Sequence, residues 1–270
     1  HQIAQFRIQS GVIMDILTHT ISGLAAGTVV ASYSKHNIRN KAGIMSLSVL
    51  GGAFPDIDAI SLWSRFDETV GVFFGLNYPG KVIYSEKFWY SHHGFFHSVL
   101  SAMLFTLLIG LVFFAINKLF YKHKNGVFDT IKSKSLLLIA FFSAYILHLI
   151  EDIPTPAATW DGVRMFFPLE KYIGGTGDIW WWNNYDIFLI ISLLMFLNLL
   201  ILLFSKFMKI KAWKLTSALF VFASVLCLYQ IKTRDFDFNY TGTSSKYQQY
   251  ELVNDKYLYN KNPKKFNVKF

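Results

Sequence analysis

The sequence predicts an all-α polytopic membrane protein, a helical bundle of about four to six transmembrane or membrane-buried helices with a small C-terminal tail. The 270 residues are 53% hydrophobic and only 16% charged, with a mean hydropathy of +0.34, whereas soluble domains carry about 25% charged residues. The apolar residues are also clustered, and residues 187–204 contain one Ser and one Asn as their only polar side chains. Such runs are long enough to cross a bilayer as helices.

Six apolar segments follow one another, at residues 16–33, 42–54, 99–121, 135–153, 185–204 and 213–231. The first is rich in Gly and Ala, which favour close helix–helix contact over lipid exposure. The second is short, so these two are weak as lipid-facing spans and are compatible with a buried hairpin. We expect one membrane-embedded domain over residues 14–231 and a tail over 232–270. Residues 1–13 lack a signal-peptide core and precede a start-like Met14, which indicates a non-native or disordered extension.

Lysine and arginine gather in alternate connections. The connections after the first, third and fifth segments are basic, with Asp129 as their only acid, and the positive-inside rule places them in the cytoplasm. Residues 55–98 and 154–184 mix acids with bases and carry aromatics such as Trp180–Trp182, so they should face outward, as should the tail. Because basic residues flank the spans and form no compact aromatic-rich patch, the net charge of +9 gives no reason to expect nucleic acid.

Ionisable side chains at the outward ends of the segments predict a metal site. The groups are His19 near the start of the first segment, Asp56 and Asp58 after the second, His92, His93 and His97 before the third, and His148, Glu151 and Asp152 at the end of the fourth. The topology follows from lysine and arginine alone, yet all these groups fall on one membrane face. That convergence is the strongest functional signal in the sequence.

The spacing of these groups is also informative. His148 and Asp152 are four residues apart, so a helix places them on one face, where they can share a metal or a metal pair. His92 and His97 are five apart and converge only if the chain turns near Gly94. Pro55 predicts an extended approach to a loop that carries the two aspartates.

We therefore predict a divalent transition-metal site. Its preferred ligands are His19, Asp56, His92, His97, His148 and Asp152. Imidazole with carboxylate favours zinc, with manganese or iron as alternatives, and six or seven ligands suit two ions. Asp58 is either a seventh ligand or a carboxylate that orients a histidine, and Asp58 or Glu151 is the predicted general base.

Plainer interpretations compete with each assignment. His148 and Asp152 could form a satisfied intrahelical pair, the aspartates could cap a turn, and His19 could be interfacial. His93, His36 and His123 are predicted not to be ligands. One shared site accounts for the common membrane face better than several unrelated interpretations do.

Five stretches taken together resemble a known family. They are residues 14–23 (MDILTHTISG), 51–58 (GGAFPDID), 92–98 (HHGFFHS), 148–155 (HLIEDIPT) and 162–169 (GVRMFFPL), and their order is similar to that of the YdjM-type inner-membrane metal-dependent hydrolases. The chain departs from that pattern at His93, where the family carries Arg, and at Phe96, where it carries Thr. The set is also distantly similar to zinc-dependent phospholipase C and P1-type nucleases, which suggests phosphoester hydrolysis.

The resemblance implies a multi-pass protein of a bacterial inner membrane with an outward-facing site. We expect a hydrolase that acts on a phosphoester or lipid-linked substrate through a metal-activated water, with membrane lipids as partners. The alternative is a non-enzymatic metal-binding membrane protein, either a transporter or a regulatory scaffold. A transporter would place its ionisable groups near mid-membrane, often between inverted repeats, and a scaffold would need no metal.

Overall fold

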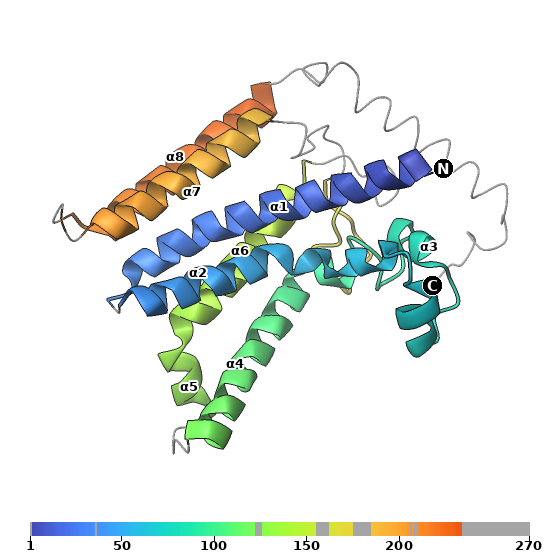
Figure 1. Ribbon diagram of the computed structural model, residues 1–270, viewed down its shortest axis with the longest axis horizontal. Coiled ribbons are helices and arrows are strands. Elements are labelled where there is room, and N and C mark those ends of the chain that lie inside the picture. Colours follow the sequence, from blue (N-terminus) through green and yellow to red (C-terminus); the bar gives the residue numbers. More distant parts are fainter. Residues whose placement is uncertain are drawn as a thin grey trace.

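The computed structural model describes residues 2–35, 37–121, 126–154, 162–174, 185–205, 207 and 210–233, and these form a bundle of long helices (Figure 1). The long helices are α1 (Gln2–Tyr33), α2 (Ile38–Ala53), α4 (Val99–Tyr121), α6 (Ser135–Glu151), α7 (Tyr185–Phe204) and α8 (Ala212–Thr233). Shorter ones are η1 (Pro55–Leu62), η2 (Asp67–Gly71), α3 (Gly80–Ser85), η3 (Phe95–His97) and α5 (Val127–Ser133). The described residues contain no strand beyond an isolated bridge between Val163 and Ile173, which confirms the all-α prediction.

Three of the described helices are long and apolar enough to cross a membrane, at Val99–Phe120, Asp186–Phe204 and Ala212–Thr233. Two bent pairs raise the number to five if each pair is one span: α2 with η1, bent by 51°, and α5 with α6, bent by 71°. Only 11–28% of each straight span is buried inside the protein, so these helices turn most of their apolar surface outward, as lipid-facing helices do. The polytopic membrane prediction is confirmed.

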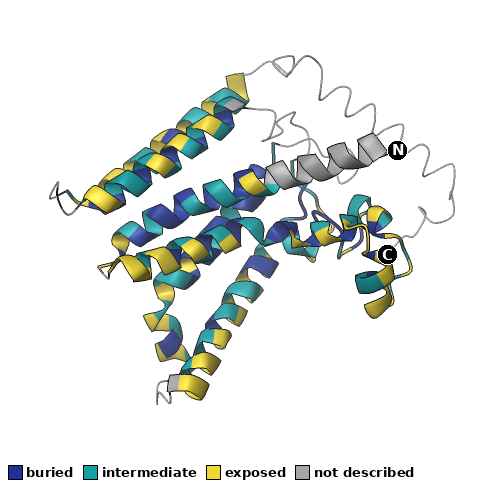
Figure 2. Ribbon diagram, viewed as in Figure 1, coloured by how far each residue is buried: buried dark blue, intermediate teal, exposed yellow. Residues whose placement is uncertain are grey.

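Helices α1, α2 and α6 form the centre of the molecule, and Figure 2 shows buried residues concentrated along the coloured part of α1, whereas α2 is exposed on one side. A Cβ on Gly51 of α2 would lie 2.3 Å from the carbonyl oxygen of Phe141 in α6, and one on Gly52 would lie 2.4 Å from that of His19 in α1. Only glycine permits approaches this close. The first two segments therefore form a tightly packed hairpin against α6.

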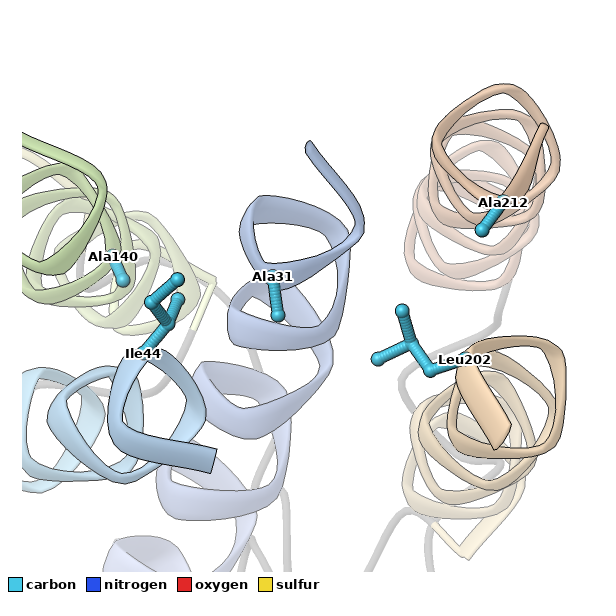
Figure 3. Close-up of a cluster of buried hydrophobic side chains, with 5 residues drawn as sticks. All are labelled: Ala31, Ile44, Ala140, Leu202 and Ala212. Atoms are coloured by element: carbon cyan, nitrogen blue, oxygen red, sulfur yellow. The ribbon is translucent and has the colours of Figure 1, made fainter. Parts of the chain in front are cut away.

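The α7–α8 pair packs against α1, and α4 diverges from the centre toward α5 (Figure 1). A cluster of small and aliphatic side chains joins five helices: Ala31, Ile44, Ala140, Leu202 and Ala212 (Figure 3). This joint, which we call the apolar joint, lies near the basic α1–α2 and α7–α8 connections. It fixes the end of the bundle at which lysine and arginine gather.

The basic connections and the predicted site occupy opposite ends. In Figure 1 the end of α1, the start of α2, the end of α7 and the start of α8 lie at the left, and α4 and α5 approach each other at the bottom. Helix α3 lies at the right-hand end, and so does the segment that follows α2. The separation expected from the charge pattern is present in the fold.

The approach to the two aspartates differs from the prediction. Phe54 has φ −68° and ψ −38°, and Pro55 is the first residue of the 3₁₀-helix η1, so the chain passes from α2 into η1 without an extended segment. Proline suits the first helical turn because it needs no N–H donor there. Asp56 and Asp58 consequently stand on a short helix and not on a loop.

Candidate metal centre

Four helices and one turn bring the predicted ionisable residues into one buried cluster. His19 comes from the middle of α1, the two aspartates from η1, the histidines at 92, 93 and 97 from η3 and the turn before it, and the last three residues from the end of α6. All of the predicted ligands and both predicted bases are buried: His19, Asp56, Asp58, His92, His97, His148, Glu151 and Asp152. Burying ionisable groups is costly unless they are paired or bind an ion. These buried side chains must therefore pair with one another or bind an ion.

Four of these side chains surround one point, and we call them the cage: Asp56, His97, His148 and Asp152. Nε2 of His97 lies 3.4 Å from Nε2 of His148. Oδ1 of Asp56 lies 3.6 Å from each of these nitrogens. Oδ2 of Asp152 lies 3.6 Å from His97 and 3.2 Å from His148. Ligand atoms at about 2.1 Å from one tetrahedral ion are separated by about 3.4 Å, so these five distances fit a shared transition metal.

His19 lies against the same cage. Its ring packs at a tilt of 34° against that of His148, with centroids 3.9 Å apart, and its Nε2 is 3.2 Å from Oδ1 of Asp152. Ligand atoms of His19, Asp56 and His148 also lie within 4.8 Å of one another. The ring of His19 is therefore placed to act as a fifth ligand or to hold Asp152 by a hydrogen bond.

Backbone and carboxylate oxygens hold the opposite edge of each ring. Nδ1 of His148 donates to the carbonyl of Gly52 at 2.7 Å, and Nδ1 of His19 lies 2.7 Å from Oε2 of Glu151. Nδ1 of His97 lies 3.2 Å from Oδ2 of Asp58, an ion-pair contact without hydrogen-bond geometry. At His148 and His19 the oxygen at Nδ1 fixes the tautomer that leaves Nε2 as the ligand atom, as is usual around metal-binding histidines. The tight glycine contact between α1 and α2 supplies one of these oxygens.

The two predicted general bases occupy orienting positions. Glu151 contacts His19 and accepts a hydrogen bond from Oγ of Ser22 at 2.8 Å, and Asp58 contacts His97 through Oδ2 and His92 through Oδ1, the latter at 2.8 Å. Both carboxylates thus steer imidazole rings. Their role as a base stays a prediction.

The carboxylates favour positive charge at the centre of the cluster. Burial lowers the pKa of His97, but the carboxylates of Asp58 and Asp56 outweigh it and raise that pKa to about 10. For His93, burial and the neighbouring His92 and His97 lower the pKa well below its ordinary value. The cage therefore stabilises a cation, whereas the ring of His93 stays neutral.

Comparison with known families gives a match over most of the chain. The family model described as YdjM inner membrane protein matches residues 14–234, which include the cage and all three straight candidate spans. The chain belongs to the YdjM inner membrane protein family. Comparison with curated proteins and comparison with solved structures gave no match.

The match to the YdjM family covers more of the chain than the motifs did. The resemblance rested on residues 14–169, whereas the match extends to residue 234. Helices α7 and α8 therefore belong to the family domain. The similarity to phospholipase C and P1-type nucleases stays a prediction. Several residues considered from the sequence, His36, His123, Trp180–Trp182 and residues 234–270, lie outside the described part of the chain.

His92 occupies a different place from the cage residues. It contacts Asp58, stacks on Tyr84 with ring centroids 4.5 Å apart, and lies 4.3 Å from the ring of His93. Its ring is 4.7 Å from that of His97, so it stands on the side of His97 that also faces His93. The turn that brings His92 and His97 together is present, and a Cβ on Gly94 would lie only 2.7 Å from the carbonyl of Trp89.

His93 is the residue that sequence reasoning set aside and that the structure includes. Its ring is buried, and ligand nitrogens of His92, His93 and His97 lie within 4.8 Å of one another. The family resemblance has Arg at this position and so gave no reason to expect a ligand there. The adjacent pair of histidines in front of an apolar run was the signal that could have identified it.

Proposed function

We propose that this protein is a membrane-embedded, metal-dependent hydrolase that cleaves a phosphoester in an amphiphilic or lipid-linked substrate. The observation that carries the proposal is the cage, in which two imidazoles and two carboxylates stand 3.2–3.6 Å apart with every measured pair at a spacing that suits one ion. A mixed imidazole–carboxylate set favours zinc, manganese or iron.

The buried oxygens of Asp56 support a bound cation. Its Oδ2 is buried and has no hydrogen-bond partner among the described residues, and its Oδ1 approaches His97 and His148 only at 3.6 Å. A buried carboxylate oxygen without a donor is costly. A divalent cation in the cage would remove that cost.

The residues of the chain have separate parts in this proposal. Asp56, His97, His148 and Asp152 would hold the ion, with His19 beside them, while Asp58, Glu151 and the Gly52 carbonyl keep the rings in register. When bound, the ion supplies Lewis acidity toward a phosphoryl oxygen and lowers the pKa of water. Zinc in catalytic sites expands to five ligands and manganese accepts six, so four protein ligands leave room for substrate.

The place of the cage favours an amphiphilic substrate. It lies where η1 continues α2 and where Val99 begins α4 directly after η3. In this proposal, the headgroup of a substrate anchored in the membrane reaches the cage from this end of the bundle. In the orientation predicted by the basic connections, this would be the outer face of the inner membrane.

Metal content and hydrolysis test the proposal together. Protein purified in detergent should contain about one equivalent of transition metal or more, and should hydrolyse bis(p-nitrophenyl) phosphate or a phospholipid such as phosphatidic acid in mixed micelles. His148→Ala should lose metal and turnover, whereas His123→Ala, outside the predicted site, should keep both. Metal-free wild-type protein that cannot be loaded would contradict the proposal. Stoichiometric metal without hydrolysis of any phosphoester in the panel would favour the metal-binding transporter.

A further inference from the structure

A second group of histidines lies beside the cage. His92, His93 and His97 are all buried, and their ring centroids form a triangle with sides of 4.3, 4.7 and 4.8 Å. One ligand nitrogen of each lies within 4.8 Å of those of the other two. Because His97 also belongs to the cage, the two groups share one side chain.

The backbone holds His93 in a conformation that directs its ring into this group. His93 has φ +62° and is the one non-glycine residue with positive φ among the described residues. Such a conformation is uncommon for a residue with a side chain and costs about 1 kcal/mol or more. It persists because the carbonyl of His93 accepts a hydrogen bond from the N–H of Arg164 at 3.1 Å. Strain of this kind concentrates at functional sites.

The tautomer of His93 follows from its partner. Nδ1 lies 3.0 Å from the carbonyl oxygen of Gly162, and a carbonyl can only accept, so Nδ1 carries the hydrogen. Nε2 is then the nitrogen with the lone pair. His92 is held in the same way, since its Nδ1 lies 2.8 Å from Oδ1 of Asp58. Both rings therefore have the tautomer of a metal-binding histidine.

Asp58 links this pair to the cage. One oxygen contacts Nδ1 of His92 and the other contacts Nδ1 of His97, at 2.8 and 3.2 Å. A single carboxylate thus orients one histidine of each group. Two-metal sites hold their ions about 3.5–4 Å apart. The ligands of two such ions must therefore be positioned relative to each other, and a carboxylate that contacts a histidine of each group does this.

We propose that Nε2 of His92 and Nε2 of His93 hold a second divalent cation next to the cage ion. With two protein ligands this ion binds more weakly than the first, and phosphoryl oxygens of the substrate complete its shell. The assignment rests on the proposed function in one respect, which is that the cage holds the first ion.

Titration of metal-depleted protein with Mn²⁺ tests this site. The protein in detergent is stripped with a chelator and loaded, bound manganese is counted after desalting, and electron paramagnetic resonance reports magnetic coupling between neighbouring ions. We expect two bound ions and a coupled spectrum for the wild-type protein. His93→Gly, which keeps the backbone since glycine adopts φ +62° freely, should bind one ion and give an uncoupled spectrum. His93→Arg should behave in the same way.

The outcomes separate the two proposals. One ion in the wild-type protein, or two coupled ions in His93→Gly, would overturn the second site and leave the cage intact. No bound ion in the wild-type protein would overturn both. Asp152→Asn serves as the matched variant of the cage, and its expected result is loss of both ions, because the weaker site depends on the first.

Discussion

The two ends of the bundle are stabilised by different physics. At one end the apolar joint brings Ala31, Ile44 and Leu202 together with other small side chains, and contact between apolar surfaces accounts for the packing. At the other end the same central helices bury histidines and carboxylates at 2.7–3.6 Å from one another. Apolar packing tolerates volume-conserving change, whereas a buried ionic cluster fails when one partner is removed. Substitutions at the two ends should therefore have separable effects on metal affinity.

The largest expected effect follows removal of a cage ligand. His148→Ala deletes a nitrogen that lies within 3.6 Å of Asp56, His97 and Asp152. We expect metal affinity to fall by more than about 100-fold, beyond the range found for orienting residues. Isothermal titration of metal-depleted protein with Zn²⁺ measures it, and unchanged affinity would mean that the cage is not the metal site.

A smaller effect should follow loss of an orienting carboxylate. Asp58→Asn keeps the size of the side chain but removes the charge that faces Nδ1 of His92 and His97. We expect affinity for Zn²⁺ to fall by about 10–100-fold. Glu151→Gln should have an effect of similar size through His19. If either variant also retains turnover in proportion to bound metal, the general-base prediction for that residue is wrong.

Next in size is a change in the helix contact beneath the cage. In Gly52→Ala the added Cβ would meet the carbonyl of His19 at 2.4 Å, so α1 and α2 must separate, at a cost of about 1–3 kcal/mol. Thermal unfolding should begin at lower temperature, and metal affinity should fall several-fold as His19 moves. Gly43→Ala in the same helix is the control, since its Cβ would meet nothing closer than Leu137 at 3.8 Å. If the unfolding temperature and the metal affinity fall in both variants, the effect belongs to α2 as a whole and not to the contact at Gly52.

The smallest effect on metal affinity is expected at the apolar joint. Ile44→Ala leaves a cavity among α1, α2 and α6 and should cost about 2–5 kcal/mol of stability. Affinity for Zn²⁺ should nevertheless stay within about twofold of wild type, because distant sites act independently. A large loss of metal affinity in this variant would show that the two ends are coupled and would remove the contrast drawn between them.

Local pattern predicted most of the helices. Apolar segments at 99–121 and 185–204 coincide with α4 and α7, and the four-residue spacing of His148 and Asp152 places their side-chain atoms 3.2 Å apart. These features depend on periodicity and composition, which are visible in the sequence itself. The junction at Pro55 was predicted wrongly, because the preference for an extended residue before proline yields when η1 continues α2.

Long-range placement could not be obtained in the same way. Nothing in the sequence says that Gly52 supplies the acceptor for His148, or that Glu151 faces His19 across 132 positions of sequence. His93 is the sharpest case, because its φ of +62° depends on hydrogen bonds to Gly162 and Arg164, which come from a later part of the chain.

The sequence by itself determined which residues are apolar enough to span a membrane, which connections are basic, and which imidazoles and carboxylates stand near helix ends, except that His19, predicted near the start of its segment, lies in the middle of α1. Those are properties of single segments. The tertiary structure decided which of these groups share one centre, dividing Asp56, His97, His148 and Asp152 from His92 and His93. The physical reason is that the cage is set by the approach of η1, η3 and the end of α6, and a distance between elements exists only after they have packed.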